Sequence, residues 1–229
     1  MFHNPTSPAI QFLAAQPWFA QLPQQMQTRV AERVWTQVGS KGEVMLAAGS
    51  PVKGWYAVVS GLVKLQSPST RGRLSAFLGV PDGEWFGEGS ALKSEPRRYD
   101  VIALRDTELL CLPRAQFDEL RASSIEFNQY LVSHLNMRLG QAMAIIEAGR
   151  LRSPEQRVAL YLSRLFWRGR RRLNLSQEEL GHLVGLSRQT VNRVLKSLEQ
   201  QGLVSLEFGR FAILNEEALA AYLASPQTD

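Results

Sequence analysis

The side chains best suited to chemistry cluster between residues 187 and 196. They are hydrogen-bond donors and acceptors rather than nucleophiles or general bases: Ser187, Arg188, Gln189, Thr190, Asn192, Arg193 and Lys196. Arginine can donate two hydrogen bonds to guanine O6 and N7, and glutamine suits adenine N6 and N7. Serine and threonine hydroxyls at a helix start can reach phosphate oxygens, helped by the open N–H groups there. The cluster therefore predicts an interface with double-stranded DNA.

Two short helices joined by a tight turn would present this cluster on one face. Ser176 and Glu179 have the spacing of a capping box that begins the first helix, and Ser176 is counted with the predicted DNA-binding residues. Gly185 lies where that helix must end, at a position where a positive φ is cheap only for glycine. Ser187 then caps the second helix, which gives the spacing of a helix-turn-helix. The apolar residues that would pack the two helices together are Leu180, Leu183, Val184, Leu186, Val191, Val194 and Leu195.

The C-terminal part of the chain carries two further signs of a DNA-binding domain. Residues 203–214 alternate in polarity and turn at Gly209, as a two-stranded wing would. Residues 150–229 hold 12 Lys and Arg against 8 Asp and Glu, whereas residues 1–149 hold 14 against 13. A basic C-terminal third beside a near-neutral remainder suggests that this end of the chain meets a polyanion.

The first half of the chain changes from a helical to a strand-like pattern near Gly42. Residues 8–35 are predicted to be helical, with breaks at Pro17 and Pro23. Beyond them, glycines separate short apolar runs, and Pro113 ends these runs because proline cannot donate to a sheet. Many short strands with turn residues between them predict a β-sandwich or roll. The predicted strands include residues 43–46, 55–59, 101–104 and 108–112.

A long helix is predicted from about residue 124 to about residue 152. A stripe as long as this helix needs a partner, and a second copy of the same helix is favoured over the sheet domain. Ser153 can cap the next helix, Pro154 fits its first position and Gln156 is placed for a capping box, so we place a domain boundary and a hinge there. The predicted domains are residues 1–123, 124–152 and 153–229. The apolar residues that recur at helical spacing along the stripe are Phe127, Leu131, Leu135, Leu139, Ala142 and Ile146.

Several classes of protein are excluded by what the sequence lacks. The single cysteine, Cys111, permits no intramolecular disulfide and no cysteine-built cluster, and no metal-ligand spacing occurs. No nucleophile–base–orienter set or phosphate-loop motif is visible, so we expect neither an enzyme nor a metal site. No apolar run approaches the ~18 residues of a membrane-spanning helix, and residues 1–5 lack a signal-peptide pattern. We therefore expect a cytoplasmic protein with no membrane partner.

The predicted order of β-roll, long helix and winged helix-turn-helix resembles the cyclic-AMP receptor protein/FNR (CRP/FNR) superfamily of bacterial transcription regulators. The resemblance covers about residues 15–215 and is most specific in residues 184–199, VGLSRQTVNRVLKSLE. It implies an α+β protein with an N-terminal cyclic-nucleotide-binding-type β-roll (jelly roll), a long dimerisation helix and a C-terminal winged helix-turn-helix. It also implies a homodimer on a palindromic DNA operator, with RNA polymerase as a further partner if the protein is an activator.

The resemblance implies that Arg188 and Arg193 occupy base-reading positions. Between them, the family's cyclic-AMP-responsive members carry glutamate where this chain has Gln189. Glutamate accepts a hydrogen bond from cytosine N4, whereas glutamine prefers adenine. We therefore do not expect the usual TGTGA half-site to carry over unchanged.

Residues 84–92 and 97–101 are similar to the phosphate-binding cassette of cyclic-nucleotide domains. The resemblance implies that backbone N–H groups of the cassette and the guanidinium of Arg98 hold a phosphate. It also implies that Glu88 accepts from a ribose hydroxyl, and that Arg138 on the long helix pairs with this glutamate. The predicted effector-binding residues are Gly87, Glu88, Gly89, Ser90, Arg98, Tyr99, Arg138, Ala142 and Met143.

Three of these positions depart from the family's pattern and leave the effector open. Tyr99 replaces the small hydroxyl residue that follows the cassette arginine, and Ala142 and Met143 replace a threonine–serine pair that contacts adenine. A site discriminates strongly by hydrogen bonding only if its own polar groups are present. Three alternatives remain: cyclic AMP, a different or larger small-molecule effector, and an inherited turn without effector in which Glu88 bridges to one of the two arginines.

Two other effectors of this superfamily can be judged from the sequence. Iron–sulfur sensing needs several cysteine ligands, normally four, and Cys111 is the single cysteine, so no iron–sulfur cluster is expected. Haem would need an axial ligand, and the histidines are His3, His134 and His182. His182 falls in the first helix of the reader, and His134 is interpreted as a polar break in the dimer seam, so haem is not expected either.

Overall fold

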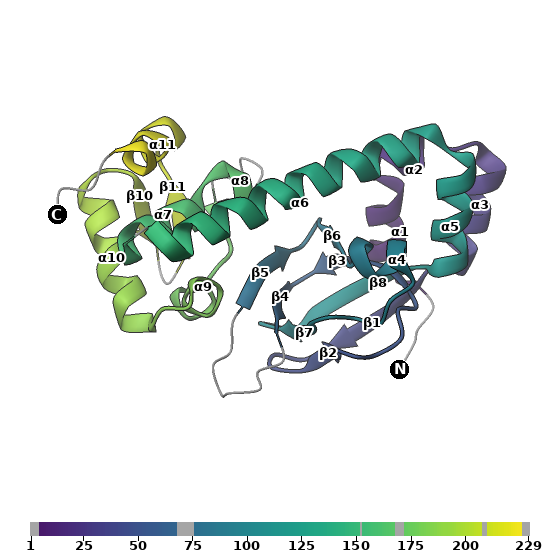
Figure 1. The fold of residues 1–229 in the computed structure, drawn as a ribbon, viewed down its shortest axis with the longest axis horizontal. Coiled ribbons are helices and arrows are strands. Elements are labelled where there is room, and N and C mark those ends of the chain that lie inside the picture. The colour runs from purple at the N-terminus through teal and green to yellow at the C-terminus, as the bar shows by residue number, and fades with distance from the viewer. Residues whose placement is uncertain (1–4, 68–75, 152, 168–171, 208–209, 226–229) are drawn as a thin grey trace. The chain divides into compact units, whose positions relative to one another are not determined.

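The structure is a computed structural model that describes residues 5–67, 76–151, 153–167, 172–207 and 210–225 (Figure 1). The chain forms two compact units, Met1–His134 and Leu135–Asp229. This division falls inside the long helix. The boundaries predicted at residues 123/124 and 152/153 follow secondary structure instead, and they stay predictions.

The first unit contains a roll of two four-stranded antiparallel sheets, with orders β1-β8-β3-β6 and β2-β7-β4-β5 (Figure 1). The predicted strands correspond to β2, β3, β7 and β8, and β8 ends at Pro113 as expected. The strands are β1 (Trp35–Gly39), β2 (Val44–Leu46), β3 (Gly54–Ser60), β4 (Leu62–Gln66), β5 (Ala76–Pro81), β6 (Trp85–Phe86), β7 (Asp100–Ala103) and β8 (Thr107–Pro113).

Helices precede, interrupt and follow these strands. The N-terminal helical region is confirmed, and its proline breaks lie at helix starts, because Pro17 begins α2 and Pro23 precedes α3. The sequence pattern did not separate the short α4 and the amphipathic α5 from the strand region. These helices are α1 (Ser7–Ala14), α2 (Pro17–Ala20), α3 (Gln24–Arg33), α4 (Glu88–Lys93) and α5 (Arg114–Ser123).

A cluster of buried aromatic rings joins the helices to the first sheet. Trp55 stacks on Trp85 with ring centroids 4.3 Å apart, and it meets Phe117 and Phe127 edge-on. Trp18 contacts Trp85 and Phe127 edge-on at 5.8 and 5.1 Å. Each of these rings buries a large apolar area, and each ring pair adds about 0.5–1.5 kcal/mol beyond that burial. The cluster therefore holds α2, α5 and the start of the next helix against β3 and β6.

The next helix, α6 (Ile125–Leu151), is 27 residues long and confirms the predicted long helix. The structure divides the predicted apolar stripe between two surroundings. Phe127 and Leu131 are buried within the first unit, whereas Leu139 and Ile146 are 59% and 57% exposed. The prediction that the whole stripe meets one partner is therefore wrong, since its N-terminal residues pack in the first unit. Among the described helices, α6 included, none is long and apolar enough to cross a membrane.

The second unit holds the predicted winged helix-turn-helix. Ser153 caps α7 by accepting a hydrogen bond from the N–H of Gln156 at 3.2 Å, as expected. The predicted wing is confirmed as the pair β10–β11, which β9 extends to a three-stranded sheet. Gly209, where the turn is predicted, lies outside the described residues. The elements are α7 (Pro154–Leu162), α8 (Arg164–Trp167), β9 (Arg172–Leu173), α9 (Gln177–Val184), α10 (Arg188–Gln200), β10 (Val204–Glu207), β11 (Arg210–Ile213) and α11 (Glu216–Ala224).

The turn between α9 and α10 depends on two glycines. Ser176 and Glu179 form both halves of the predicted capping box at the start of α9. Gly185 ends α9 in the left-handed conformation, with φ +69°. Gly181 lies directly under the turn, and the N–H of Leu186 donates to its carbonyl oxygen at 3.0 Å. The close approach fixes the angle between the two helices.

We expect Gly181→Ala to disrupt this approach. A Cβ at Gly181 would lie 2.7 Å from the carbonyl oxygen of Leu186, a backbone atom that cannot easily move away. Overpacking typically costs about 1–3 kcal/mol, so the free energy of unfolding measured in urea should decrease by an amount in that range. Gly149→Ala is the control, because no described atom outside its own stretch of helix lies within 4 Å of the added methyl group, and alanine favours a helix. Equal losses in both variants would contradict this account.

Candidate DNA-reading face and effector site

α10 has an apolar face toward the unit and a polar face toward solvent. Val191, Val194, Leu195 and Leu198 are buried, in agreement with the predicted packing. The polar residues predicted to read bases lie on the opposite side, and four of them are exposed: Arg188, Gln189, Arg193 and Lys196. A helix that is apolar on one side and carries donors on the other can lie in a DNA major groove without losing its packing.

The first turn of α10 is capped by Ser187 and is exposed to solvent. The Ser187 hydroxyl accepts from the N–H of Thr190 at 3.1 Å, and the two hydroxyl oxygens lie 2.9 Å apart. Asn192 is half-buried and accepts from the Gln177 side chain at 3.4 Å. Ser176 serves the cap of α9 in the same way, by accepting from the N–H of Glu179 at 3.2 Å. The structure thus brings the predicted α10 residues to one face, with Ser176 at the start of the preceding helix.

One predicted base-reading residue already has an acidic partner. Arg193 lies 3.4 Å from a carboxylate oxygen of Glu155, in the first turn of α7. The arginine side chain is 70% exposed, so this ion pair is worth little in water and can be exchanged for a base edge. The sequence pattern gave no sign of this pair, because the two residues are distant along the chain.

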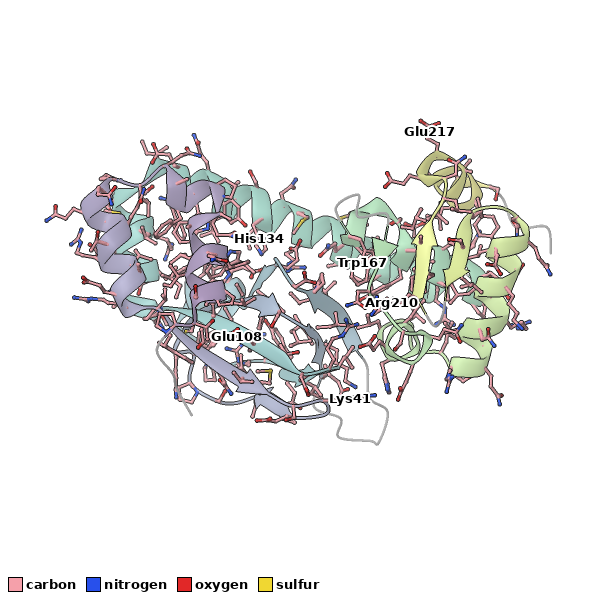
Figure 2. The ribbon with its side chains drawn as sticks, turned by 180° about the vertical axis from the view of Figure 1, so that it is seen from behind. Lys41, Glu108, His134, Trp167, Arg210 and Glu217 are labelled. Carbon is pink, nitrogen blue, oxygen red and sulfur yellow. The ribbon has the colours of Figure 1, made fainter. Side chains whose placement is uncertain are left out.

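The predicted cassette forms a tight turn and the short helix α4. Gly87 precedes α4 in the left-handed conformation, with φ +89°, which explains the glycine. Glu88 and Ser90 are buried, whereas Gly89 is exposed. The carboxylate of Glu88 lies 3.5 Å from Nε2 of His134. His134 belongs to α6 and is labelled in Figure 2.

His134 occupies a different place from the one expected. Its side chain is 1% exposed within the first unit, and its ring lies 5.7 Å from Trp55 and 6.2 Å from Tyr130. The interpretation of His134 as a polar break in a dimer seam is therefore wrong. It packs among aromatic side chains and contacts the buried carboxylate of Glu88.

The arginine that faces the cassette is Arg97 and not its neighbour. Arg98, the predicted phosphate ligand, is 73% exposed and pairs with Glu95 at 2.8 Å. Arg97 is 2% exposed, and its Nη1 would lie 3.4 Å from a Cβ placed on Gly87. Both arginines precede β7 and lie outside the strands, so strand alternation gave no signal for choosing between them.

Arg97 is held by backbone hydrogen bonds and flanked by aromatic rings. Its N–H donates to Ser50 at 3.1 Å and its carbonyl accepts from Gly49 at 2.7 Å. Its guanidinium carbon lies 5.1 Å from the ring centre of Tyr56 and 5.9 Å from that of Tyr99. Tyr99 therefore lies beside the guanidinium of Arg97, whereas the sequence analysis placed it directly after Arg98 as the cassette arginine. Neither Nε nor Nη1 of Arg97 has a hydrogen-bond partner among the described residues.

The remaining predicted effector residues lie on the part of α6 in the second unit. Arg138 donates to the Gln141 side chain at 2.9 Å, and Gln141 donates to the carbonyl of Leu165 in α8 at 2.9 Å. Ala142 and Met143 are exposed in the single chain. Neither carries a polar side-chain group that could pair with a nucleotide base.

Two family models match the chain. Residues 37–124 match the cyclic nucleotide-binding domain, and residues 156–222 match the Crp-like helix-turn-helix domain. The chain is also 32% identical to the cyclic AMP receptor protein of Thermus thermophilus over 187 residues, which cover 80% of this chain and 85% of that protein. The chain belongs to the CRP/FNR family.

Solved protein structures have the same fold. FixK2 of Bradyrhizobium japonicum superposes with a TM-score of 0.69 at 23% identity, over 84% of this chain and 98% of that one. A CRP/FNR transcriptional regulator of Thermus thermophilus superposes with a TM-score of 0.57 at 26% identity, over 83% and 98%. The expected fold and family are thus confirmed: the chain is a CRP/FNR transcription regulator with a DNA-binding helix-turn-helix.

The CRP/FNR roll contains one buried thiol, which lies beside Tyr56 in the register of β3 and β8. Burial raises the pKa of Cys111 to about 12 from 9.0, while Tyr56, Arg97 and Lys53 oppose the shift. Burial likewise raises the pKa of Tyr56. Within the described residues, no group of three or more His, Cys, Asp or Glu is placed to hold a metal ion. Cys111 is therefore an inert core residue at neutral pH.

The raised pKa of Cys111 predicts a loss of stability at high pH. Between pH 9 and 12 the unfolded chain releases a proton that the folded chain keeps, so the free energy of unfolding falls as the pH rises. Below pH 9 this contribution is fully present. Urea denaturation at several pH values should show a decline that is shallower in Cys111→Ala, by up to about 1.4 kcal/mol per pH unit. Tyr56 is present in both proteins, so parallel curves would rule out the thiol as a source.

Proposed function

We propose that the protein is a homodimeric transcription regulator that reads a palindromic DNA site with α10. The observation that carries this proposal is the division of α10 into a buried apolar face and an exposed face of donors. Arg188, Gln189 and Arg193 would contact base edges, and Ser187 and Thr190 would contact phosphates. Ser176, Asn192 and Lys196 complete the proposed DNA-binding set. The wing formed by β10 and β11 supports the same surface.

The exposed face of α6 supports the dimer. Four large apolar side chains lie seven residues apart along this helix and are more than half exposed: Ile125, Val132, Leu139 and Ile146. Met143 lies between the last two and is 63% exposed. A seven-residue apolar repeat is the pattern of a helix that packs against a second helix. Two copies of α6 would bury it, and their two-fold axis would place two copies of α10 in successive turns of the major groove.

Activity of such a regulator would take place where the chromosome lies, in the cytoplasm. RNA polymerase is the proposed further partner if the protein activates transcription. A binding role explains Glu88 and Arg97 with fewer assumptions than a catalytic one, because the site has no nucleophile with an adjacent base. We therefore infer a regulator rather than an enzyme.

We also propose that the roll binds a small-molecule effector through its cassette. The match to the cyclic nucleotide-binding domain supports this, and the related Thermus thermophilus protein is named a cyclic AMP receptor. The role first predicted for Arg98 is better suited to Arg97, which faces Gly87. The side chains of Ala142 and Met143 offer no hydrogen bonds to adenine. Cyclic AMP and an effector of another class are therefore both tested.

Selection of DNA from a random pool by the purified protein tests the proposed function. The selection is carried out at fixed salt, once with and once without cyclic AMP. A palindrome should be enriched in at least one of the two. Arg188→Ala should then lose roughly 1–3 kcal/mol of discrimination at one base pair of each half-site, because a bidentate contact to a base is lost. Its affinity for non-specific DNA should change less, since that affinity comes mostly from phosphate contacts.

The control for this experiment is Arg121→Ala, which removes an exposed arginine from α5 in the first unit. Uniform weakening on all sequences by Arg188→Ala would assign the residue to phosphate contact instead. No enrichment of any sequence, with or without the nucleotide, would count against α10 as a base reader.

The proposed dimer predicts the effect of a charge in the α6 repeat. Leu139→Glu should convert the protein to monomers in sedimentation velocity, because burying an unpaired carboxylate in the seam is unfavourable. The same substitution should leave each unit folded, since Leu139 is 59% exposed in the single chain. Val44→Glu is the control, as an apolar residue of similar exposure (50%) on β2. A Leu139→Glu variant that stays dimeric would place the interface elsewhere.

A further inference from the structure

A cavity of about 330 Å³ opens in the first unit beside Arg97. Its polar lining includes Lys53, from the connection between β2 and β3, and Tyr56 of β3. Met45 and Pro51 supply apolar walls. Ligand pockets commonly measure ~300–1,000 Å³ and combine apolar walls with a few polar groups that converge. The cavity has both features at the small end of that range.

The charge of this cavity is unbalanced. Its described lining carries two cationic side chains, Lys53 and Arg97, and no carboxylate. Arg97 is 2% exposed, and its Nε and Nη1 lack hydrogen-bond partners among the described residues. Burying a guanidinium with two unpaired nitrogens is unfavourable, and the side-chain hydrogen bond and the ring contact with Tyr56 compensate only in part. A bound anion would supply the missing acceptors.

The cavity differs from the nucleotide site expected at the cassette. None of residues 87–90 lines it, and neither does any predicted effector residue of α6. Arg97 is the element that the two places share, because its Nη1 also lies beside Gly87. A ligand in the cavity would therefore use the buried guanidinium without the glutamate and helix contacts that a cyclic nucleotide needs.

We propose that this cavity binds a small organic acid. A carboxylate or phosphate head is held by Arg97 and Lys53, and a short apolar body packs against Met45 and Pro51. The planar guanidinium matches both heads, since each can accept two parallel hydrogen bonds. The proposal rests on the effector-responsive regulator proposed above. It differs in placing the effector in this cavity, which shares only Arg97 with the surroundings of the cassette, and in naming its chemical class.

Binding to the full-length protein tests this proposal directly. Thermal unfolding and titration calorimetry are carried out in a buffer free of carboxylate and phosphate. The probes are inorganic phosphate, a series of straight-chain mono- and dicarboxylates from two to six carbons, their neutral amides, and cyclic AMP. At least one acid should raise the melting temperature, because a ligand that binds only the folded state stabilises it, and its amide should not. The comparison between phosphate and carboxylate arms identifies the head group.

Three variants locate the site. Arg97→Gln should weaken binding of the active acid at least about tenfold, because it removes charged hydrogen bonds to the anion. Lys53→Gln should weaken the same binding to a smaller degree, and it keeps the test valid if Arg97→Gln does not fold, since Lys53 is an exposed side chain. Arg98→Gln is the matched control: it removes the same charge one residue away, from a side chain that is 73% exposed, and should change nothing.

The outcomes separate this proposal from the regulator function. It is overturned if no acid binds, if only cyclic AMP binds, or if Arg98→Gln rather than Arg97→Gln removes binding. DNA selection does not depend on this result, so a protein that enriches a palindrome and binds no acid would refute the acid site alone. A protein that binds an acid at Arg97 but enriches no DNA would support the site and refute the proposed reader.

Discussion

Both units of this protein are built on one helix, and that helix must satisfy two surfaces at once. The N-terminal turns of α6 place Phe127, Leu131 and His134 against the sheet, where they complete the aromatic core around Trp55. Its other face leaves Val132, Leu139 and Ile146 exposed at seven-residue spacing. A helix cannot move its buried residues out of an aromatic core without losing several kcal/mol of packing, so the exposed repeat is fixed in direction by the core. The sheet domain thereby decides which face of α6 meets a partner.

The same constraint explains why the polar groups near the cassette are arranged as they are. The core wall beside β3 and β6 is aromatic, and Glu88 faces it with His134 at 3.5 Å. Arg97 lies on the interior side of the roll under Tyr56, where its charge is desolvated. A desolvated guanidinium is costly for folding and strongly attractive to an anion for the same electrostatic reason. The buried charge of Arg97 therefore lowers the stability of the roll and, for the same reason, favours binding of an anion.

The sequence could be interpreted correctly where the interacting residues lie close together along the chain. Ser153, Ser176, Ser187 and Gly185 were assigned correctly, because caps and left-handed turns are decided within a few residues. The division of the α6 stripe was missed, since apolar spacing alone does not say which residues meet the sheet and which meet solvent. The exchange of Arg97 for Arg98 is instructive in another way. The family pattern located the cassette, but it could not separate two neighbouring arginines in a segment outside the strands, of which Arg97 is buried and Arg98 exposed.

In the proposed regulator, a signal from the roll would travel along α6, which both units share, and the contacts within the second unit show how the helix is held there. Gln141 joins Arg138 to the Leu165 carbonyl, so the helix meets α8 through a buried amide and not through apolar packing alone. A buried hydrogen bond of this kind has a defined geometry and is costly to leave unmade. Further along, Glu155 in the first turn of α7 contacts Arg193, a predicted base reader. An effector can shift this arrangement only by the difference in its affinity for the two states of the roll. In that regulator, the ligand contacts that matter would be those that differ between the two states, and a ligand bound equally well in both would not shift the equilibrium.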